Sequence, residues 1–106
     1  MATLDDYPDL IKQLPEFEGP FDAYRLSAEH CEVLFASYPA GTRIEEHTHD
    51  TENVGIITKG ALLLTMDGKT EQFEAGQWYH VPAQKPHAAE FLDATSEIEF
   101  WFSANN

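Results

Sequence analysis

The stretch GTRIEEHTHDTENVGIITKG, residues 41–60, decides how this sequence is interpreted. It places His47 and His49 two residues apart in a segment that we predict to be a β-strand. Side chains at i and i+2 of a strand lie on one face, roughly 6.6 Å apart at the backbone. Two such imidazoles can bind one ion, with Zn–N bonds of ~2.0–2.1 Å. An HxH pair alone is more often two exposed or hydrogen-bonded histidines, so the rest of the chain must support a metal site.

Three further residues bear on this candidate metal site. Asn53 lies four residues after His49 and shares its strand face, but a neutral amide is a weak ligand. Glu52 has the opposite parity and reaches the same place only through a β-bulge, so it is the less favoured ligand. His87 follows a proline-containing turn and has small neighbours that leave room for an ion or a substrate. It is the candidate third histidine ligand.

The length and composition indicate one globular domain. A chain of 106 residues fits a single domain, and its 42% hydrophobic content argues against a disordered tail. No apolar run approaches the ~20 residues that a membrane span needs. The first ten residues carry aspartates and no basic segment, so we expect no secretory signal. Cys31 is the only cysteine and cannot form an internal disulfide, which makes the cytoplasm the expected compartment.

The charge balance restricts the possible partners. Six Lys and Arg residues stand against 19 Asp and Glu residues, a formal net charge of −13. Phosphate binding depends on basic side chains, so we expect neither nucleic acid nor an anionic membrane surface as a partner. The acidity serves solubility, or it attracts cationic partners.

The order of apolar and turn residues favours an all-β protein. Short strand-like runs recur every 8–12 residues, which is typical of a sandwich or barrel, at residues 31–38, 42–49, 53–60, 61–66, 69–74, 77–83, 87–92 and 97–104. The pair Asp67-Gly68 between two of them predicts a hairpin turn. Residues 1–27 read as an N-terminal arm with one or two helical turns between Pro8 and Pro15. Its apolar side consists of Leu10, Ile11 and Leu14.

The spacing of the histidines, glycines and prolines resembles the cupin superfamily. The first cupin motif is Gly, five residues, His-x-His, three or four residues, Glu, six residues, Gly. Here it reads Gly41, His47, His49, Asn53, Gly60. The second motif is Gly, five residues, Pro-x-Gly, two residues, His, three residues, Asn. Here it reads Gly76, Pro82, Gln84, His87, Phe91. Asn53 stands where the family has a metal-binding Glu, Gln84 replaces a turn glycine and asks for a different turn geometry, and Phe91 replaces the final Asn.

This resemblance implies a fold, a metal and an assembly. The expected fold is a single cupin-type antiparallel β-barrel, jelly-roll-like, over residues 28–106, with residues 1–27 as a short helical arm of the same domain. The resemblance also implies a divalent transition metal held by His47, His49 and His87. The sequence does not choose among iron, manganese, nickel, copper and zinc. Family members are often homodimers, and an apolar outer sheet face with a packed arm fits a homodimer here.

The replacement of Glu by Asn53 shapes the functional hypothesis. Three neutral histidines leave the charge of a divalent ion uncompensated, so the site should favour a small anionic molecule. Such a site resembles the three-histidine oxygenases of the family, and an oxygenase-type enzyme is the first hypothesis. A metal-dependent isomerase or lyase and a non-catalytic small-molecule binding or sensing module are the alternatives.

Residues near the motifs have alternative roles. Arg43 shares the parity of His47 and either reaches an anionic substrate or stays solvated. His80 is a structural histidine or a pocket wall, and Gly55 either widens the cavity or accommodates a bulge. We expect the large aromatic residues to build the core or a dimer face, with some of them lining the pocket: Phe35, Trp78, Tyr79, Phe91 and Trp101.

Overall fold

Two antiparallel sheets contain most of the residues that the structure describes. The computed structural model describes residues 7–103. Its elements are α1 (Asp9–Lys12), β1 (Asp22–Ala28), β2 (Cys31–Tyr38), β3 (Thr42–His47), β4 (Glu52–Lys59), β5 (Ala61–Met66), β6 (Lys69–Glu74), β7 (Trp78–Val81), β8 (His87–Phe91) and β9 (Thr95–Phe102). One sheet has the order β1-β2-β9-β4-β7 and the other the order β3-β8-β5-β6. None of the helices in the described part of the chain is long and apolar enough to cross a membrane.

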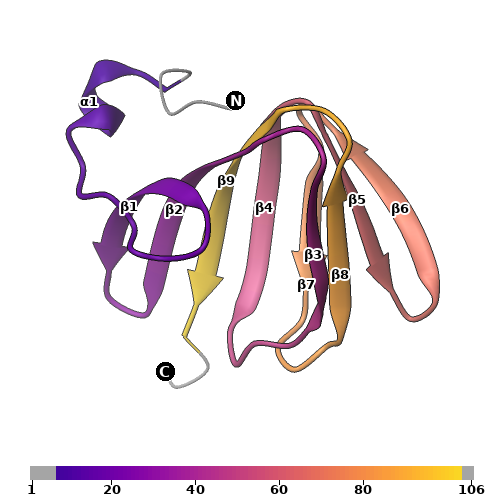
Figure 1. Cartoon of the computed structure of the whole chain (residues 1–106). Coiled ribbons are helices and arrows are strands. Elements are labelled where there is room, and N and C mark those ends of the chain that lie inside the picture. Colours follow the sequence, from indigo (N-terminus) through magenta and orange to yellow (C-terminus); the bar gives the residue numbers. More distant parts are fainter. Residues whose placement is uncertain (1–6, 104–106) are drawn as a thin grey trace.

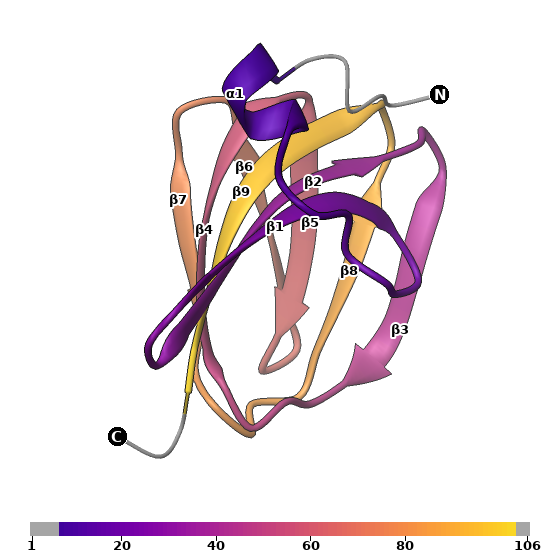
Figure 2. The ribbon, with the colours of Figure 1, turned by 90° about the vertical axis from the view of Figure 1, so that its left-hand side faces the viewer.

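The two sheets face each other and enclose a common interior (Figures 1 and 2). Every strand pair is antiparallel, as the expected barrel requires. The fold predicted from the sequence, a small all-β barrel with a short N-terminal helix, is therefore confirmed. The buried core takes residues from both sheets: Ala23, Leu34, Ala36, Tyr38, Ile57, Leu62, Leu64, Val81 and Phe91.

The turn at Asp67-Gly68 is confirmed as a two-residue hairpin. Met66 pairs with Lys69, and both loop residues have positive φ, 53° for Asp67 and 76° for Gly68. Positive φ at both central positions suits the right-handed twist of the flanking strands. This hairpin joins β5 to β6 at one edge of the four-stranded sheet.

Strand β1 was not expected from the sequence. Residues 22–28 pair along their whole length with β2 and form one edge of the five-stranded sheet. Of these residues, Ala23 alone is buried, so the strand has no alternation of large apolar side chains that the sequence could display. Its backbone hydrogen bonds to β2 define it instead.

The N-terminal arm packs through aromatic residues more than through its predicted apolar side. The helix is a single turn, and Leu10 is 78% exposed. Tyr7 is buried and donates its hydroxyl toward the carbonyl oxygens of Ala36, at 2.7 Å, and Glu97, at 2.8 Å. Its ring meets Phe35 edge-on, with 5.8 Å between centroids. These contacts fix the arm against β2 and β9.

Strand β9 divides its side chains between two environments. Ile98, Phe100 and Phe102 share one face, as the sequence indicated, and that face is the outer one. Glu97 and Glu99 share the opposite face and are buried inside the barrel. Successive strand residues point to opposite faces, so the apolar outer row places two carboxyl groups inside.

Candidate metal centre

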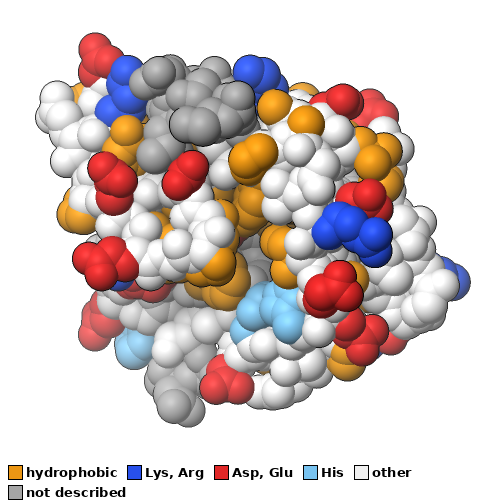
Figure 3. All heavy atoms as spheres, in the orientation of Figure 1, with side chains coloured by type: hydrophobic (Ala, Val, Ile, Leu, Met, Phe, Trp, Pro, Cys, Tyr) orange, Lys and Arg blue, Asp and Glu red, His pale blue; other side chains and the backbone are white. Residues whose placement is uncertain are grey.

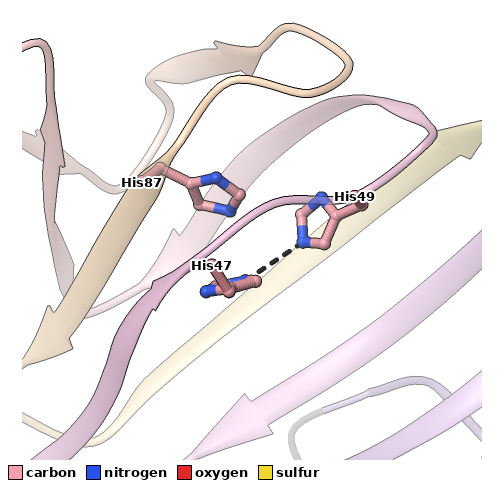
Figure 4. Close-up of side chains that lie close together, drawn as sticks. All are labelled: His47, His49 and His87. Atoms are coloured by element: carbon pink, nitrogen blue, oxygen red, sulfur yellow. Dashed lines mark hydrogen bonds between the residues drawn. The ribbon is translucent and has the colours of Figure 1, made fainter.

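Three histidine side chains, two from the end of β3 and the loop after it and one from the start of β8, lie close together (Figure 4). His47 ends β3, His87 begins β8, and the two are direct partners in the register of these strands. His49 lies in the bend before β4. Each residue offers a ring nitrogen, and these nitrogens lie within 4.8 Å of one another. Nitrogens bound to one ion at 2.0–2.1 Å would lie roughly 3–4 Å apart, so small side-chain rotations suffice to close the cluster.

The backbone at His49 differs from the expected strand. The strand predicted over residues 42–49 ends at His47, and its pairing with β8 shifts register between Ile44 and His47. The two histidines therefore meet through a bend and not through simple strand parity. The turn before β8 holds this bend, because the backbone N–H of Gln84 donates to the His49 carbonyl at 2.8 Å.

Gln84 itself has the left-handed backbone conformation that glycine favours, with φ of 66°. Its side-chain amide donates to Asp50 Oδ1 at 2.6 Å, which ties the turn to the loop that carries His49. The residue that replaces the motif glycine thus keeps the left-handed backbone conformation. Its side chain adds a hydrogen bond to Asp50, beside the one between its backbone N–H and His49.

Two of the histidines have a fixed tautomer. His47 Nδ1 lies 2.7 Å from the carbonyl oxygen of Glu45, and His87 Nδ1 lies 2.9 Å from that of Lys85. A carbonyl oxygen can only accept, so each Nδ1 carries the proton and donates it. The neutral rings then keep a free lone pair on Nε2, the arrangement in which outer hydrogen bonds orient metal-binding histidines.

Asn53 lies beside His49 and is 7% exposed. Its Nδ2 is 3.3 Å from His49 Nδ1, and its Oδ1 accepts a hydrogen bond of 2.5 Å from the hydroxyl of Thr51. The amide therefore contacts the ring nitrogen of His49 that faces away from His47. Asn53 thus lies on the same face of the strand as expected from its spacing, toward the histidines.

Glu52 points elsewhere. Its carboxylate accepts from His80 Nε2 at 2.7 Å and from the backbone N–H of Ala83 at 2.7 Å. The Ala83 N–H and His80 lower the pKa of this half-exposed carboxyl. Glu52 and His80 therefore bond each other at the surface, and His80 has a structural hydrogen bond there.

Burial depresses the basicity of two histidine rings. The pKa of His49 falls to about 4, first because the ring is removed from water and then because His87 and His47 repel its charged form. The pKa of His87 is also lowered, mainly by burial, although its bond to the Lys85 carbonyl opposes the shift. Both rings are therefore neutral at physiological pH, the form in which a ring nitrogen can coordinate a metal.

A cavity of about 600 Å³ opens beside the three histidines. Figure 3 shows histidine side chains gathered at the edge of a hollow with hydrophobic walls. Arg43 lines it with Glu45, so the first of the two roles considered for Arg43, contact with a ligand in the cavity, is geometrically open to it. Four aromatic rings stack in succession along one wall, with centroid distances of 4.1–5.1 Å: Phe17, Phe21, Tyr38 and Phe91.

The same cavity contains a buried pair of carboxyl groups. Glu97 is 1% exposed and Glu99 is 4% exposed. Glu97 accepts from the hydroxyl of Tyr79, while Glu99 accepts from Tyr38 at 2.5 Å and from the indole N–H of Trp101 at 3.0 Å. Burial is the largest cause that raises the pKa of both carboxyls, and repulsion by Glu99 raises that of Glu97 further. The pair therefore holds at least one proton under conditions in which surface glutamates are ionised.

Comparison with protein families identifies the chain. The family model described as the cupin domain matches residues 34–100, more than half of the chain. The protein belongs to the cupin family. The matched segment contains both of the motifs from which the resemblance was inferred, so that inference is confirmed.

Solved structures share the fold of this cupin at low sequence identity. An RmlC-like cupin from Shewanella frigidimarina has a TM-score of 0.76 and 19% identity, covering 90% of this chain and 88% of the other. A chain from the crystal structures of DMSP lyases has a TM-score of 0.70 and 22% identity, covering 79% of this chain and 48% of the other. A variant of salicylate 1,2-dioxygenase from Pseudoaminobacter salicylatoxidans has a TM-score of 0.68 and 20% identity, covering 76% and 25%.

The remaining aromatic residues of this cupin fall on both sides of the five-stranded sheet. Phe91 and Trp101 line the cavity with Tyr79, whereas Phe35 packs against the arm and Trp78 is exposed. Gly55 makes room for the ring of Tyr79, because a Cβ at Gly55 would lie 2.4–2.5 Å from its atoms. The glycine therefore neither widens the cavity nor marks a bulge, since β4 and β7 pair regularly there.

Two features of the site were not found from the sequence, the Glu97–Glu99 pair and the contact between Asn53 and Thr51. The alternation of β9 indicated that Glu97 and Glu99 share a face, but nothing in the local pattern indicates that this face is the buried one. The tyrosines that bond them lie 18 and 61 residues away in the chain.

Proposed function

We propose that this cupin binds a divalent transition metal through His47, His49 and His87 and acts on a small anionic molecule in the adjoining cavity. The observation that carries the proposal is the meeting of three imidazoles at the cavity, two of them held with Nε2 unprotonated by backbone carbonyls. This donor set fits iron, manganese, nickel, copper or zinc, since imidazole suits several of these ions. Three protein ligands leave positions for water or substrate.

Oxygenase-type chemistry remains the first hypothesis for the activity. A metal bound here would polarise a coordinated oxygen atom and, if redox-active, take part in oxygen chemistry. The three histidines contribute no negative charge to the ion, and this favours an anionic substrate. Arg43 also lines the cavity, where the charge of Glu45 offsets its own. A salicylate dioxygenase shares the fold, which is compatible with this chemistry at the level of architecture.

A metal-dependent isomerase or lyase is the second hypothesis, and the Glu97–Glu99 pair is the observation that favours it. A buried carboxyl pair with raised pKa values that lines the cavity can hold or move a proton near neutral pH. A solved structure of the same fold is that of DMSP lyases. A non-catalytic binding or sensing role is the remaining alternative. For each of these functions, the cytoplasm is the expected location.

One experiment separates these hypotheses. The protein is loaded with Fe²⁺ without oxygen and mixed with a panel of small diketones, hydroxy acids and thiols, after which oxygen uptake and products are followed. Uptake with a panel compound supports the oxygenase. Product formation without oxygen supports the isomerase or lyase, and unchanged but bound compounds support the binding module. Equal metal content in wild type and in a variant lacking a histidine ligand would contradict the oxygenase and the isomerase or lyase, because both depend on the metal.

Replacing Asn53 tests the charge argument. We expect Asn53→Glu to raise metal retention, because a carboxylate adds an anionic ligand and lowers the charge of the site from about +2 to about +1. The same change should weaken the binding of anionic chelators from the panel. Metal content after dialysis and titration of the metal-loaded proteins measure both effects.

Glu52→Ala is the matched control for that substitution. The carboxylate of Glu52 bonds His80 and the Ala83 N–H, so its removal should leave metal content unchanged. A glutamate variant at position 53 that binds the panel as tightly as wild type, or loss of metal in Glu52→Ala, would show that the three-histidine site is wrong.

We also propose a homodimer that uses the outer face of the five-stranded sheet. Two apolar rows cross the strands of this face. One runs through Ile98, Ile56 and Trp78, next to Phe35 under the arm, and the other through Leu26, Val33, Phe100 and Val54. Trp78 is 54% exposed although its ring lies 6.1 Å from that of Phe100. Exposed apolar patches of this kind mark interaction sites.

Light scattering at micromolar concentration should therefore give the mass of a dimer. Trp78→Glu should shift the protein toward monomer, because a charge would be buried in the apolar contact. Leu92→Glu is the control, since Leu92 is equally exposed and follows β8 in the other sheet. A wild-type monomer would disprove the homodimer, and an equal effect of both substitutions would place the interface elsewhere.

A further inference from the structure

A directed chain of hydrogen bonds runs from Thr51 to Glu45 through the histidine cluster. His47 carries its proton on Nδ1, which donates to the Glu45 carbonyl, so His47 Nε2 has a lone pair. His49 Nε2 lies 3.1 Å from that nitrogen and must be the donor between the two rings. His49 Nδ1 is then unprotonated, and it faces the Nδ2 donor of Asn53 at 3.3 Å. Thr51 completes the chain by donating to Asn53 Oδ1.

Metal binding requires the opposite tautomer of His49. An ion shared by the three histidines takes the lone pair of His49 Nε2, so the single proton of the neutral ring has to reside on Nδ1. That N–H would then face the NH₂ group of Asn53, and two donors would oppose each other. A buried group that loses its hydrogen bond is destabilised, and this weakens metal binding unless the neighbour adapts.

Asn53 can adapt by a half-turn of its amide. After the turn, Oδ1 accepts from His49 Nδ1–H and Nδ2 donates to Thr51. The hydroxyl of Thr51 accepts as readily as it donates, so no polar atom is left without a partner. The described residues contain no buried side-chain nitrogen or oxygen atom without a hydrogen bond, and the half-turn preserves that state.

We propose that Asn53 is a positioning residue that fits both states of the centre, its amide donating to His49 in the metal-free form and accepting from it in the metal-bound form, with Thr51 reversing its hydroxyl in step. This role rests on the proposed metal site and goes beyond it, since it concerns a residue that does not touch the ion. A carboxylate at this position only accepts, and an aliphatic side chain does neither. The amide of Asn53 has both a donor and an acceptor and can serve both tautomers.

The first test needs no metal. Long-range ¹⁵N–¹H NMR spectra at pH 8 report which nitrogen of His49 carries the proton. Metal-free wild type should have it on Nε2. Asn53→Asp presents an acceptor alone and should move it to Nδ1, while Asn53→Leu should give a mixture. A purely structural role of Asn53 would leave the tautomer unchanged in all three proteins, and that result overturns the proposal.

The second test uses Zn²⁺ alone as the probe. Zinc should move the proton of His49 from Nε2 to Nδ1 in wild type. Asn53→Leu should lower zinc affinity about 10–100-fold, the usual effect of removing an outer hydrogen-bond partner of a metal-binding histidine. Thr51→Val should lower it less and in the same direction. Thr65→Val removes a comparable hydroxyl, bonded to Thr70 on the far hairpin, and should have no effect.

The possible failures point to different conclusions. Wild-type protein that binds no zinc contradicts the proposed metal site. Zinc binding with full affinity in Asn53→Leu contradicts only the role of Asn53. The absorption spectrum of bound Co²⁺ reports the coordination number of the ion. A lower coordination number in Asn53→Leu than in wild type would mean that the amide is a direct ligand, and would overturn its positioning role. Melting midpoints of each variant establish that the compared proteins are folded.

Discussion

His87→Ala should abolish stoichiometric metal binding. Wild-type protein dialysed against zinc is expected to retain one equivalent, and the variant should lose more than about 100-fold in affinity, beyond the effect of removing an outer partner. The reason is geometric, because His87 is the ligand that β8 contributes, directly opposite His47 of β3 in the register. Elemental analysis and competition with a coloured chelator measure the loss. His47→Ala should behave in the same way.

His80→Ala is the matched control for this prediction. His80 bonds Glu52 on the surface and lies outside the cluster of three rings, so its removal should leave zinc binding unchanged. Equal metal content in wild type, His87→Ala and His80→Ala would refute the site. Zinc affinity should also fall less steeply on acidification than three ordinary histidines would give, because the lowered pKa values of His49 and His87 reduce competition from protons.

Glu97→Gln should stabilise the protein increasingly as the pH rises. The folded state raises the pKa of Glu97 and so keeps a proton that the unfolded chain releases above about 4.5. Wild-type stability therefore falls between that pH and the raised folded pKa, by up to about 1.4 kcal/mol per pH unit for one proton. A glutamine at this position accepts from Tyr79 and donates to Glu99, as a protonated Glu97 does, with no proton to lose.

The measurement is the difference between the two unfolding free energies from pH 5 to pH 8. Using the difference cancels the contribution of His49, whose lowered pKa makes both proteins less stable as the pH falls from about 6.5 toward 4. Each 1 kcal/mol corresponds to a shift of about 4–8 °C in the melting midpoint of a domain near this size. Glu71→Gln, at an exposed position on β6, should give a curve parallel to wild type. A parallel curve for Glu97→Gln as well would show that the pair holds no extra proton.

The parts of the structure that could be predicted are those with a local signal. The hairpin at Asp67-Gly68 follows from two residues that tolerate positive φ, and the spacing of His47, His49 and His87 indicated which histidines would meet. Each of these inferences needs only residue identities a few positions apart, together with the family spacing. The structure has the hairpin at these two residues and brings the three histidines together, although His49 lies in the loop between β3 and β4 and not in a strand.

The parts that could not be predicted depend on partners far away in the chain. Strand β1 has a largely exposed side-chain pattern, and its pairing with β2 defines it. The inward direction of Glu97 and Glu99 depends on tyrosines from β2 and β7 that satisfy the carboxyl groups. A rule that places apolar residues inside would have assigned the wrong face of β9, because Ile98, Phe100 and Phe102 all lie on the outer face.

The position of Trp101 makes the protein its own optical reporter. Its ring lies 4.7 Å from that of His49, and its N–H is bonded to Glu99. The indole thus contacts both the histidine cluster and the carboxyl pair, and its emission should respond to an ion or a charge at either place. The only other tryptophan is Trp78, which is exposed on the outer face. A Trp78→Phe protein would therefore carry Trp101 as its single tryptophan, and ligands could be screened by tryptophan emission alone, without label or coupled assay.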